Sequence, residues 1–413
     1  MGSYQAQSRR GEASLAAGRP LIVIGITNPQ TCLVMTGRLR ALRQAGFRVV
    51  LIASPGALLE STARKEGVAA LPIPMRRGIE PLADIVSLLR LVRALRRLRP
   101  QMTEFSTPKA GLLGSIASLL CRVPCRIYVL RGLRLETARG ITRQVLTATE
   151  KIAAACSHIV LCNSPSLRSK ALDLRIAGAE KLHLLGYGSS NGVDVQRFAP
   201  GPRAREAAIA WSKGEQIIGF VGRLTCDKGI PELLRAFDAV LDRQAKARLL
   251  LVGWFDESED ALDPELREWI KRHPRIWCTG FVPDTAPWYR MMDFLVLPTH
   301  REGLPNVVLE AAAAGLPVVT TTATGACDAV LPGVTGLLTP KGDPRSLTDA
   351  MMELLEDAGR RKQMGAAARR WVVEHFPQER VHARTVQWYR ELVEGREGKS
   401  AALSITDAAA ATD

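Results

Sequence analysis

Short apolar runs rich in β-branched residues alternate with helical patterns along most of this chain. LIVIGIT (Leu21–Thr27) is followed by an expected helix near Val34–Ala45 and then by RVVLIAS (Arg48–Ser54). Such alternation is typical of βαβ units, in which helices cover a parallel sheet. Three more strands of this series are expected at Tyr128–Leu130, His158–Ser164 and Leu182–Gly188.

A second series of the same kind begins after residue 207. Its expected strands are Gln216–Leu224, Ala247–Gly253, Ile276–Val282, Phe294–Thr299 and Pro317–Thr321. Because 413 residues are too many for one core, the two series predict two domains. The fold class is therefore α/β, with two doubly wound, Rossmann-like domains facing each other across a cleft. The carboxyl ends of both sheets, where open α/β sheets bind ligands, would lie on that cleft.

The connecting segments indicate where these domains begin and end. The expected order is a flexible lead-in (1–18), an N-terminal domain (19–190), a linker (191–207), a C-terminal domain (208–375), a C-terminal helix that packs back towards the N-terminal domain (376–397) and a disordered tail (398–413). The tail is expected to be disordered because it is rich in Ala, Ser, Thr and Asp.

Charge is divided unequally between the two halves of the chain. Residues 1–190 contain 28 Lys and Arg against 10 Asp and Glu, a net charge of +18, whereas residues 191–413 carry −3. The first half is therefore expected to meet an anionic partner. Five Arg lie in VSLLRLVRALRRLRP (Val86–Pro100), which is either a sheet-packing helix with a solvated basic face or a contact with anionic lipid. The apolar runs are too short for a membrane span or a signal peptide, so a cytoplasmic location is expected.

Two carboxylates flank the otherwise apolar stretch REGLPNVVLEAAAAGLPVV. Glu302 follows an expected strand, and a helix is expected to start at Pro305 or Asn306 and to end at Gly315. Glu310 would then lie about one turn inside that helix. It is either an acid that is favourable near a helix start or part of a functional site. The free N–H groups of the loop that starts the helix would form an anion site.

Two cations follow another expected strand, in FVGRLTCDKG. Arg223 offers a planar fork and Lys228 a point charge, so together they suit a diphosphate. Each alone could be a surface charge. With the helix start, however, they predict a site for a doubly charged anion, and the nearby carboxylates suit the hydroxyls of ribose or a sugar.

Several other kinds of site lack their sequence signals. There is no GxxxxGK[ST] motif, no Asp-x-Asp and no cluster of His, Asp and Glu at ligand spacing, so no metal and no cofactor is implied. A basic nucleic-acid-binding protein would need aromatic residues among its basic stretches. Residues 20–190 contain only four aromatic residues of the Phe, Tyr and Trp types, which are Phe47, Phe105, Tyr128 and Tyr187, so nucleic acid is not expected as a partner.

The segments FVGRLTCDKGIPELLRAF, GFVPDTAPWYRMMDFLVLPTHREGLPNVVLEAAAAGLPVV and PGVTGLL resemble the signature series of retaining family-4 glycosyltransferases with the GT-B fold. The resemblance runs from Leu21 to Val393. It implies a metal-independent hexosyltransferase with an acceptor-side N-terminal domain and a nucleotide-sugar-binding C-terminal domain. It also implies retention without an established enzymatic nucleophile, the leaving phosphate taking the acceptor proton.

The same resemblance assigns roles to individual residues. Arg223 and Lys228 would hold the donor diphosphate and, with Glu302, act in catalysis. Glu310 would bind the ribose, and the backbone at Phe281 and Val282 the base. The full implied donor-binding set is Gly222, Arg223, Lys228, Phe281, Val282, Glu302, Gly303, Leu304, Pro305, Asn306 and Glu310.

STPKAGLLG, LRGLRLET and GSSNGVDVQRF resemble a branch that builds capsule, exopolysaccharide or O-antigen (lipopolysaccharide) repeat units. That branch implies a donor that is a UDP-linked hexose or N-acetylhexosamine and an acceptor saccharide on a polyprenyl diphosphate. It also implies peripheral attachment to an anionic membrane surface, on the cytoplasmic face of the inner membrane. A sugar-nucleotide epimerase on the same architecture is the alternative.

One feature departs from the family pattern. Many family-4 enzymes have a His near the donor sugar, whereas no His lies between Met1 and Cys156 here. Lys109 and Arg131 are the polar residues in the two corresponding loops and become the acceptor-side candidates. Lys109 could instead serve only to start a helix.

Overall fold

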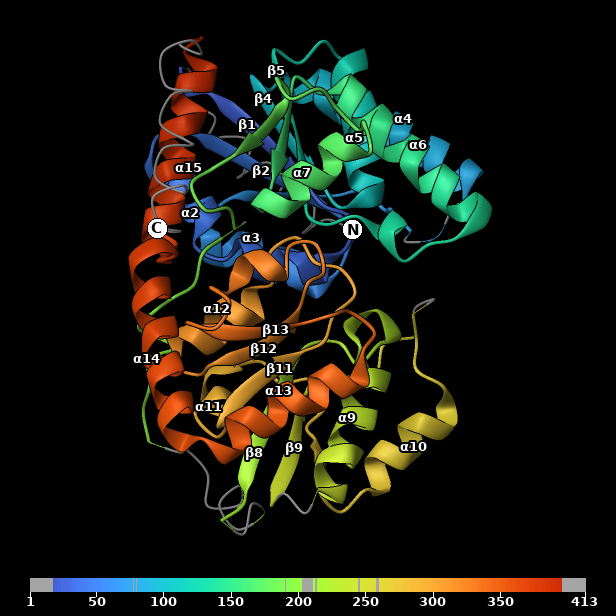
Figure 1. The fold of residues 1–413 in the computed structure, drawn as a ribbon. Coiled ribbons are helices and arrows are strands. Elements are labelled where there is room, and N and C mark those ends of the chain that lie inside the picture. Colours follow the sequence, from blue (N-terminus) through green and yellow to red (C-terminus); the bar gives the residue numbers. More distant parts are fainter. Residues whose placement is uncertain are drawn as a thin grey trace.

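The computed structural model describes residues 18–395 except 77, 79, 190, 203–210, 212–213, 244–245 and 258–259. It contains two domains, each a parallel sheet covered by helices, and one domain lies above the other in Figure 1. The predicted fold class is confirmed. The predicted lead-in, except Gly18, and the predicted disordered tail lie outside the described residues. No helix in the described part is both long and apolar enough to cross a bilayer.

The N-terminal sheet has seven parallel strands in the order β3-β2-β1-β4-β5-β6-β7. The strands are β1 (Leu21–Gly25), β2 (Arg48–Ala53), β3 (Ala69–Pro72), β4 (Met102–Ser106), β5 (Cys125–Leu130), β6 (Ile159–Cys162) and β7 (Leu182–Leu184). The helical segments are η1 (Pro29–Met35), α2 (Arg38–Gln44), α3 (Ala57–Glu66), α4 (Pro81–Leu98), α5 (Pro108–Leu120), η2 (Arg134–Glu136), α6 (Gly140–Cys156) and α7 (Pro165–Asp173).

The structure corrects several expectations about this domain, and strand β3 is one element that was not expected. The helix expected near Val34–Ala45 is divided into η1 and α2, because Gly37 between them has a φ of +83°. The last strand ends at Leu184, before two glycines with positive φ. Strand β4 was not expected because MTEFS contains no apolar run. It is nevertheless fully buried, with Glu104 paired to the buried Arg38.

The C-terminal sheet has six parallel strands in the order β10-β9-β8-β11-β12-β13. The strands are β8 (Gln216–Val221), β9 (Ala247–Val252), β10 (Ile276–Cys278), β11 (Phe294–Leu297), β12 (Val318–Thr321) and β13 (Gly336–Thr339). The helical segments are η3 (Cys226–Lys228), α9 (Ile230–Asp242), α10 (Pro264–Arg272), α11 (Ala286–Tyr289), α12 (Asn306–Ala313), η4 (Cys327–Ala329), α13 (Pro344–Glu356) and α14 (Ala358–His375).

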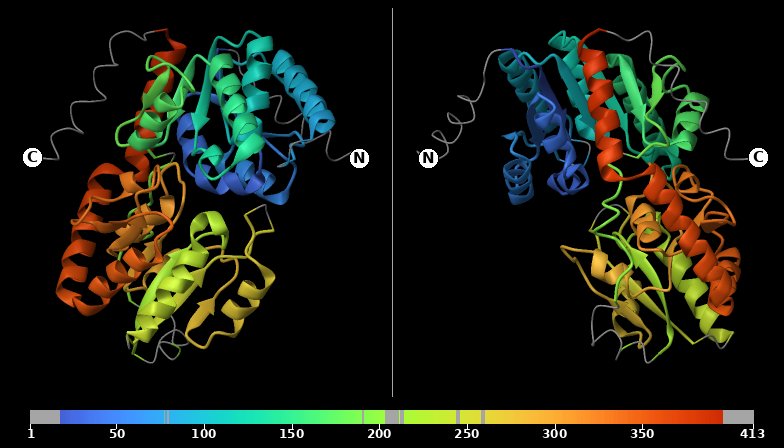
Figure 2. Two further views of the ribbon diagram at one scale, coloured as in Figure 1. Left: turned by 45° about the vertical axis from the view of Figure 1, so that its right-hand side comes forward. Right: turned by 90° about the vertical axis from the view of Figure 1, so that its left-hand side faces the viewer.

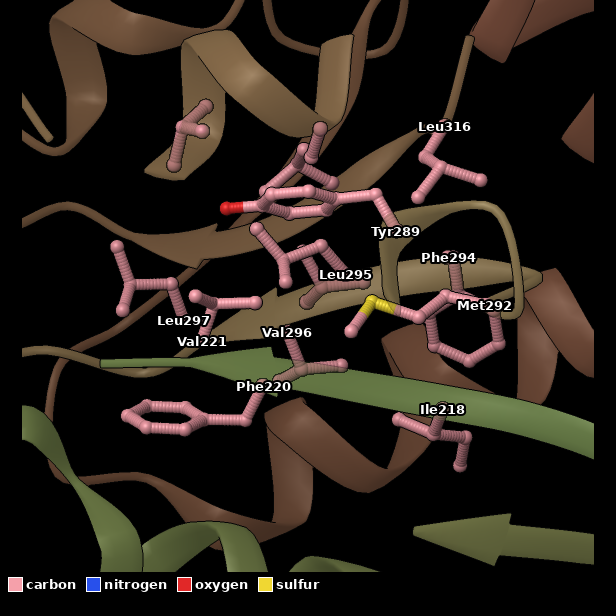
Figure 3. Close-up of a cluster of buried hydrophobic side chains, with 14 of the residues drawn as sticks. Ile218, Phe220, Val221, Tyr289, Met292, Phe294, Leu295, Val296, Leu297 and Leu316 are labelled. Atoms are coloured by element: carbon pink, nitrogen blue, oxygen red, sulfur yellow. The ribbon is translucent and has the colours of Figure 1, made fainter. Parts of the chain in front are cut away.

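The two central strands of this sheet carry its core. Side chains of β8 and β11, among them Phe220 and Leu295, pack with Tyr289 and Met292 in one apolar cluster (Figure 3). Because β8 and β11 are neighbours although about 70 residues separate them in sequence, the loops after them lie side by side. That adjacency brings the two predicted parts of the site together.

The last helix, α15 (Gln378–Val393), leaves the C-terminal domain and runs along the N-terminal one (Figures 1 and 2). It packs against α2, and the buried Tyr389 on it donates a hydrogen bond to Glu104. Arg38 donates to the same Tyr389 hydroxyl over 2.7 Å. A buried polar cluster thus joins the end of the chain to β4.

Candidate functional site

The start of α12 presents unpaired polar groups. The helix begins at Asn306 after Pro305, and the chain turns at Gly315 with a φ of +76°. Within the described residues, the N–H groups of Gly303, Leu304 and Asn306 have no hydrogen-bond partner, and the Asn306 Oδ1 atom is buried without one. Unpaired N–H groups at the positive end of a helix dipole form a site for an anion.

Lys228 lies at the end of η3, after β8, and meets the loop that follows β11. Its Nζ atom is 2.5 Å from Glu302 Oε1. Gly229 makes this approach possible, because it has a φ of +73° and a Cβ there would lie 2.0 Å from the carbonyl oxygen of Pro298. The two predicted residues are therefore brought together at one edge of the sheet.

Arg223 lies in the same loop but has different partners. It forms a salt bridge with Asp256 and lies 3.9 Å from Asp227. Burial alone would raise the pKa of Asp227, but Lys228 and Arg301, with a hydrogen bond from the Thr225 hydroxyl, lower it below its ordinary value. Asp227 is thus an ionised carboxylate among three cations, and it fixes the loop that carries two of them.

Glu310 lies one turn inside α12 and away from the lysine. The Tyr289 hydroxyl donates a hydrogen bond to it over 2.8 Å. Desolvation raises the pKa of Glu310 above its ordinary value, and the bond from Tyr289 only partly opposes that shift. The carboxylate is therefore poorly solvated, and additional hydroxyl donors would stabilise its ionised form.

Phe281 and Val282 follow β10. The exposed Phe281 ring packs edge-on against Trp254, with 5.5 Å between the ring centroids. Val282 lines a pocket of about 530 Å³ together with Trp277, Thr279, Pro283, Asp284, Pro287 and Trp288. Trp254 was not selected from the sequence, although it directly follows the glycine that ends an expected strand.

Arg131 directly follows β5 and meets this site from the N-terminal domain through its backbone. A Cβ on Gly303 would lie 2.4 Å from the carbonyl oxygen of Arg131, so only glycine fits there. The Nε and Nη2 atoms of Arg131 are buried and unpartnered within the described part of the chain. Burial, with Arg38 nearby, lowers the pKa of Arg131 to about 10, although Glu104 opposes the shift.

The other acceptor-side candidate, Lys109, has a structural partner. Its Nζ atom is 2.6 Å from Asp84 Oδ1 and also donates to the carbonyl of Gly78. Lys109 lies in the first turn of α5 and Asp84 in that of α4. This pair holds two helix starts together, which agrees with the alternative given for Lys109.

Arg301 was missed by the sequence reasoning although it directly precedes Glu302. It contacts Asp227 at 2.8 Å and Asp260 at 3.4 Å, and its Nε atom donates to Thr137 Oγ1 over 3.0 Å. Thr137 belongs to the N-terminal domain. A second bond across the cleft runs from the Thr324 hydroxyl to Glu136 over 2.7 Å. The signal that could have identified Arg301 is a third cation beside the paired carboxylates.

Two family models match the chain. "Glycosyl transferases group 1" matches residues 215–357 and "Glycosyl transferase 4-like domain" matches residues 34–188. The capsular polysaccharide biosynthesis glycosyltransferase CapM of Staphylococcus aureus is 33% identical over 375 residues, which cover 91% of this chain and 98% of that protein.

A more distant relative and a solved structure extend the comparison. The Escherichia coli UDP-Gal:alpha-D-GlcNAc-diphosphoundecaprenol alpha-1,3-galactosyltransferase is 24% identical over 299 residues, covering 71% of this chain and 76% of that protein. The structure of HepE from Anabaena in complex with UDP-glucose has a TM-score of 0.74 at 18% identity, covering 90% of this chain and 99% of that one. The likeness to HepE shows the fold.

Proposed function

The chain belongs to the GT-B glycosyltransferases of the group 1 and 4-like type, related to enzymes of capsule synthesis, and on that premise we propose the reaction that it catalyses. It moves a hexose or N-acetylhexosamine from a UDP-linked donor to a saccharide carried on a polyprenyl diphosphate. The anomeric configuration of the sugar is retained. The product is a longer lipid-linked saccharide for a surface polysaccharide.

The observation that carries this proposal is the pairing of Lys228 with Glu302 beside the start of α12. A donor diphosphate bound there forms ion pairs with Lys228 and Arg223. These pairs replace the ion pairs that the two side chains make with carboxylates in this structure. The N–H groups of Gly303 and Leu304 donate to its oxygens. Fixed donors directed at the oxygens that gain charge as the C–O bond breaks stabilise the transition state.

The remaining donor contacts follow from the positions of the side chains. Glu310 accepts hydrogen bonds from the ribose hydroxyls, which supply the donors that its desolvated carboxylate needs. The base lies against the turn at Phe281 and Val282. Glu302, next to the phosphate loop, faces the transferred sugar.

Two features support an acceptor that carries phosphate. Arg131, an acceptor-side candidate, places its backbone carbonyl against the Gly303 loop from the N-terminal domain, and its buried guanidinium is incompletely paired within the described residues. The E. coli relative acts on a saccharide linked to diphosphoundecaprenol, as its name states. The charge of +18 on residues 1–190 supports peripheral attachment to the anionic cytoplasmic face of the inner membrane, where such a lipid would be met.

The chemistry needs no protein nucleophile in this scheme. As the donor C–O bond breaks, the leaving phosphate oxygen takes the proton of the acceptor hydroxyl, and that hydroxyl oxygen bonds to the anomeric carbon on the face that the phosphate leaves. The cations named above hold the phosphate, and no metal takes part.

The test is a panel of UDP-, GDP- and ADP-sugars, first by thermal shift and then with a synthetic polyprenyl-diphosphate saccharide as acceptor. The expected result is stabilisation and transfer with a UDP-sugar, and an NMR coupling constant that shows the donor's anomeric configuration in the product. Transfer from no donor would refute the proposal. Incubation of the donor alone distinguishes the proposed transferase from the alternative, because an epimerase would convert the sugar nucleotide without an acceptor.

A further inference from the structure

The outer face of α4 combines two kinds of exposed side chain. Leu82, Ile85 and Leu89 are 82%, 55% and 63% exposed, and Val86 is exposed beside them. They point away from the buried row of Ser87, Leu91 and Leu95 because their spacing of three and four residues places them on the opposite side of the helix. Single exposed apolar residues are common, but four on one helix face form a patch.

The same face continues as a basic surface. Arg93, Arg96 and Arg97 follow Leu89 at helical spacing and are exposed. The apolar half therefore occupies the N-terminal turns of α4 and the basic half its C-terminal turns. Asp84, the one acid on α4, is paired with Lys109.

Helix α6 presents a similar face nearby. Ile141, Val145 and Ile152 are exposed along one side of it, and Ile141 is 78% exposed. Arg139 is exposed just before its start, and Arg143 is exposed in its first turn but on the other side of the helix from Ile141. Helix α5 packs against both α4 and α6, so the three form one layer on the outside of the N-terminal domain (Figure 1).

The apolar N-terminal turns of α4 and the start of α6, where Ile141 lies, point towards the cleft. In a parallel α/β domain the helices start at the edge where the strands end, which here is the edge facing the C-terminal domain. Glu136 and Thr137, just before α6, make the hydrogen bonds across the cleft to Thr324 and Arg301. Asp84, in the first turn of α4, is tied to the start of α5.

We propose that the outer faces of α4 and α6 form an insertion surface for an anionic lipid bilayer, with the apolar side chains in the acyl boundary and the Arg residues on the phosphate groups. This inference rests on the proposed function only for its purpose, which is to place the mouth of the cleft at the membrane surface where a lipid-linked acceptor is held. The surface takes lipid rather than a second copy of the chain, because a second copy would offer the same apolar and basic side chains but no negative charge to the Arg residues. A bilayer offers both apolar chains and negative charge.

The experiment is cosedimentation of the purified full-length protein with two kinds of vesicle. One contains phosphatidylglycerol and phosphatidylethanolamine in equal parts, and the other contains phosphatidylcholine alone. The expected result is binding to the anionic vesicles. The double variant Leu82→Glu/Leu89→Glu should lose at least ~10-fold in partition coefficient, because it removes inserted apolar area and adds repulsive charge. The triple variant Arg93→Ala/Arg96→Ala/Arg97→Ala should bind more weakly and respond less to salt.

The matched control is Val373→Glu, since Val373 is also an exposed apolar residue on a helix, α14, but in the other domain. It should bind vesicles within twofold of the wild type. The inference is overturned if the wild type ignores both vesicle types or if the double variant binds as the wild type does. It is also overturned if sedimentation velocity shows a dimer that the double variant abolishes, because a second copy would then cover the surface.

Activity separates this inference from the proposed function. All variants should transfer sugar at the wild-type rate to a water-soluble acceptor with a short lipid, whereas the double variant should be slower with an acceptor embedded in vesicles. Absence of transfer by the wild type would refute the proposed function and leave the vesicle result to decide the insertion surface.

Discussion

Lys228 Nζ lies 2.5 Å from Glu302 Oε1, and this contact joins the loop after β8 to the loop after β11. Both side chains are largely buried, so the pair is shielded from solvent. A cation held in this way is already in position when a phosphate arrives. The carboxylate that it leaves then becomes available to the hydroxyls of the sugar.

Removal of either cation should slow the reaction without unfolding the protein. Lys228→Ala and Arg223→Ala are each expected to reduce kcat by ~10²-fold or more, as loss of a charge-stabilising donor commonly does. The measurement is steady-state transfer. Arg243→Ala is the control, because Arg243 forms an exposed pair with Asp349 at 2.8 Å and should stay within twofold of the wild type. Near-normal rates in both cation variants would contradict the proposal that Lys228 and Arg223 hold the donor diphosphate.

Glu302→Gln should mainly lower the rate. The amide keeps the size of the side chain and an acceptor oxygen but loses the charge that holds Lys228. We expect kcat to fall by about tenfold or more, with a smaller change in the affinity for the nucleotide, measured by calorimetry with UDP. A variant with the wild-type kcat would place Glu302 outside the reaction.

Donor affinity should decrease at acidic pH because Glu310 must be ionised to accept from ribose. Its pKa is raised by desolvation, so the carboxylate gains a proton, and affinity is lost, at a higher pH than for an ordinary Glu. Affinity should be full above that pKa and fall as the pH passes down through it. A UDP-sugar is the suitable ligand, since its esterified diphosphate does not titrate in this range.

Glu310→Gln provides the comparison for that profile. The variant should bind the UDP-sugar about tenfold more weakly at neutral pH, because neutral acceptors make weaker hydrogen bonds. Its affinity for the UDP-sugar should also no longer decrease at acidic pH. An unchanged affinity together with an unchanged pH profile would remove Glu310 from the ribose site.

Arg301 is expected to affect the reaction beyond its own loop, because its guanidinium contacts Asp227, Asp260 and Thr137. Arg301→Ala removes contacts to Asp227 and to Thr137 across the cleft, and kcat/KM should fall by about tenfold. Thr137→Val removes only one neutral acceptor, so a decrease of about two- to fivefold is expected. Equal losses in the two variants would show that the interdomain bond carries the whole effect, and no loss in either would show that Arg301 is not required.

Transfer is expected to continue after metal removal. Lys228, Arg223 and the helix N–H groups supply the positive charge near the diphosphate in this scheme. Dialysis against EDTA followed by assay in chelator should leave at least half of the activity, with readdition of Mg²⁺ or Mn²⁺ as the control. A complete loss that either ion restores would show that a metal carries part of this charge.

Most of the strand and helix alternation of each half could be predicted locally, because it depends on neighbouring residues, although β3 and β13 were not expected. The approximate start of α12 and the turn at Gly315 that follows its end were likewise predictable from helix-end signals. Strand β4 was not, since MTEFS has no apolar run and is buried only because Arg38 and Tyr389 satisfy Glu104. Those partners come from α2 and α15, at the two ends of the chain.

The sequence by itself determined the class of fold and the residue types of the candidate site. The spacing of Glu302 and Glu310, and of Arg223 and Lys228, is local information. The tertiary structure decided which of them meet: Lys228 binds Glu302, whereas Glu310 takes Tyr289. It also decided that Arg131 reaches Gly303 from the other domain. The physical reason is strand order, since β8 and β11 become neighbours only when the whole sheet has assembled.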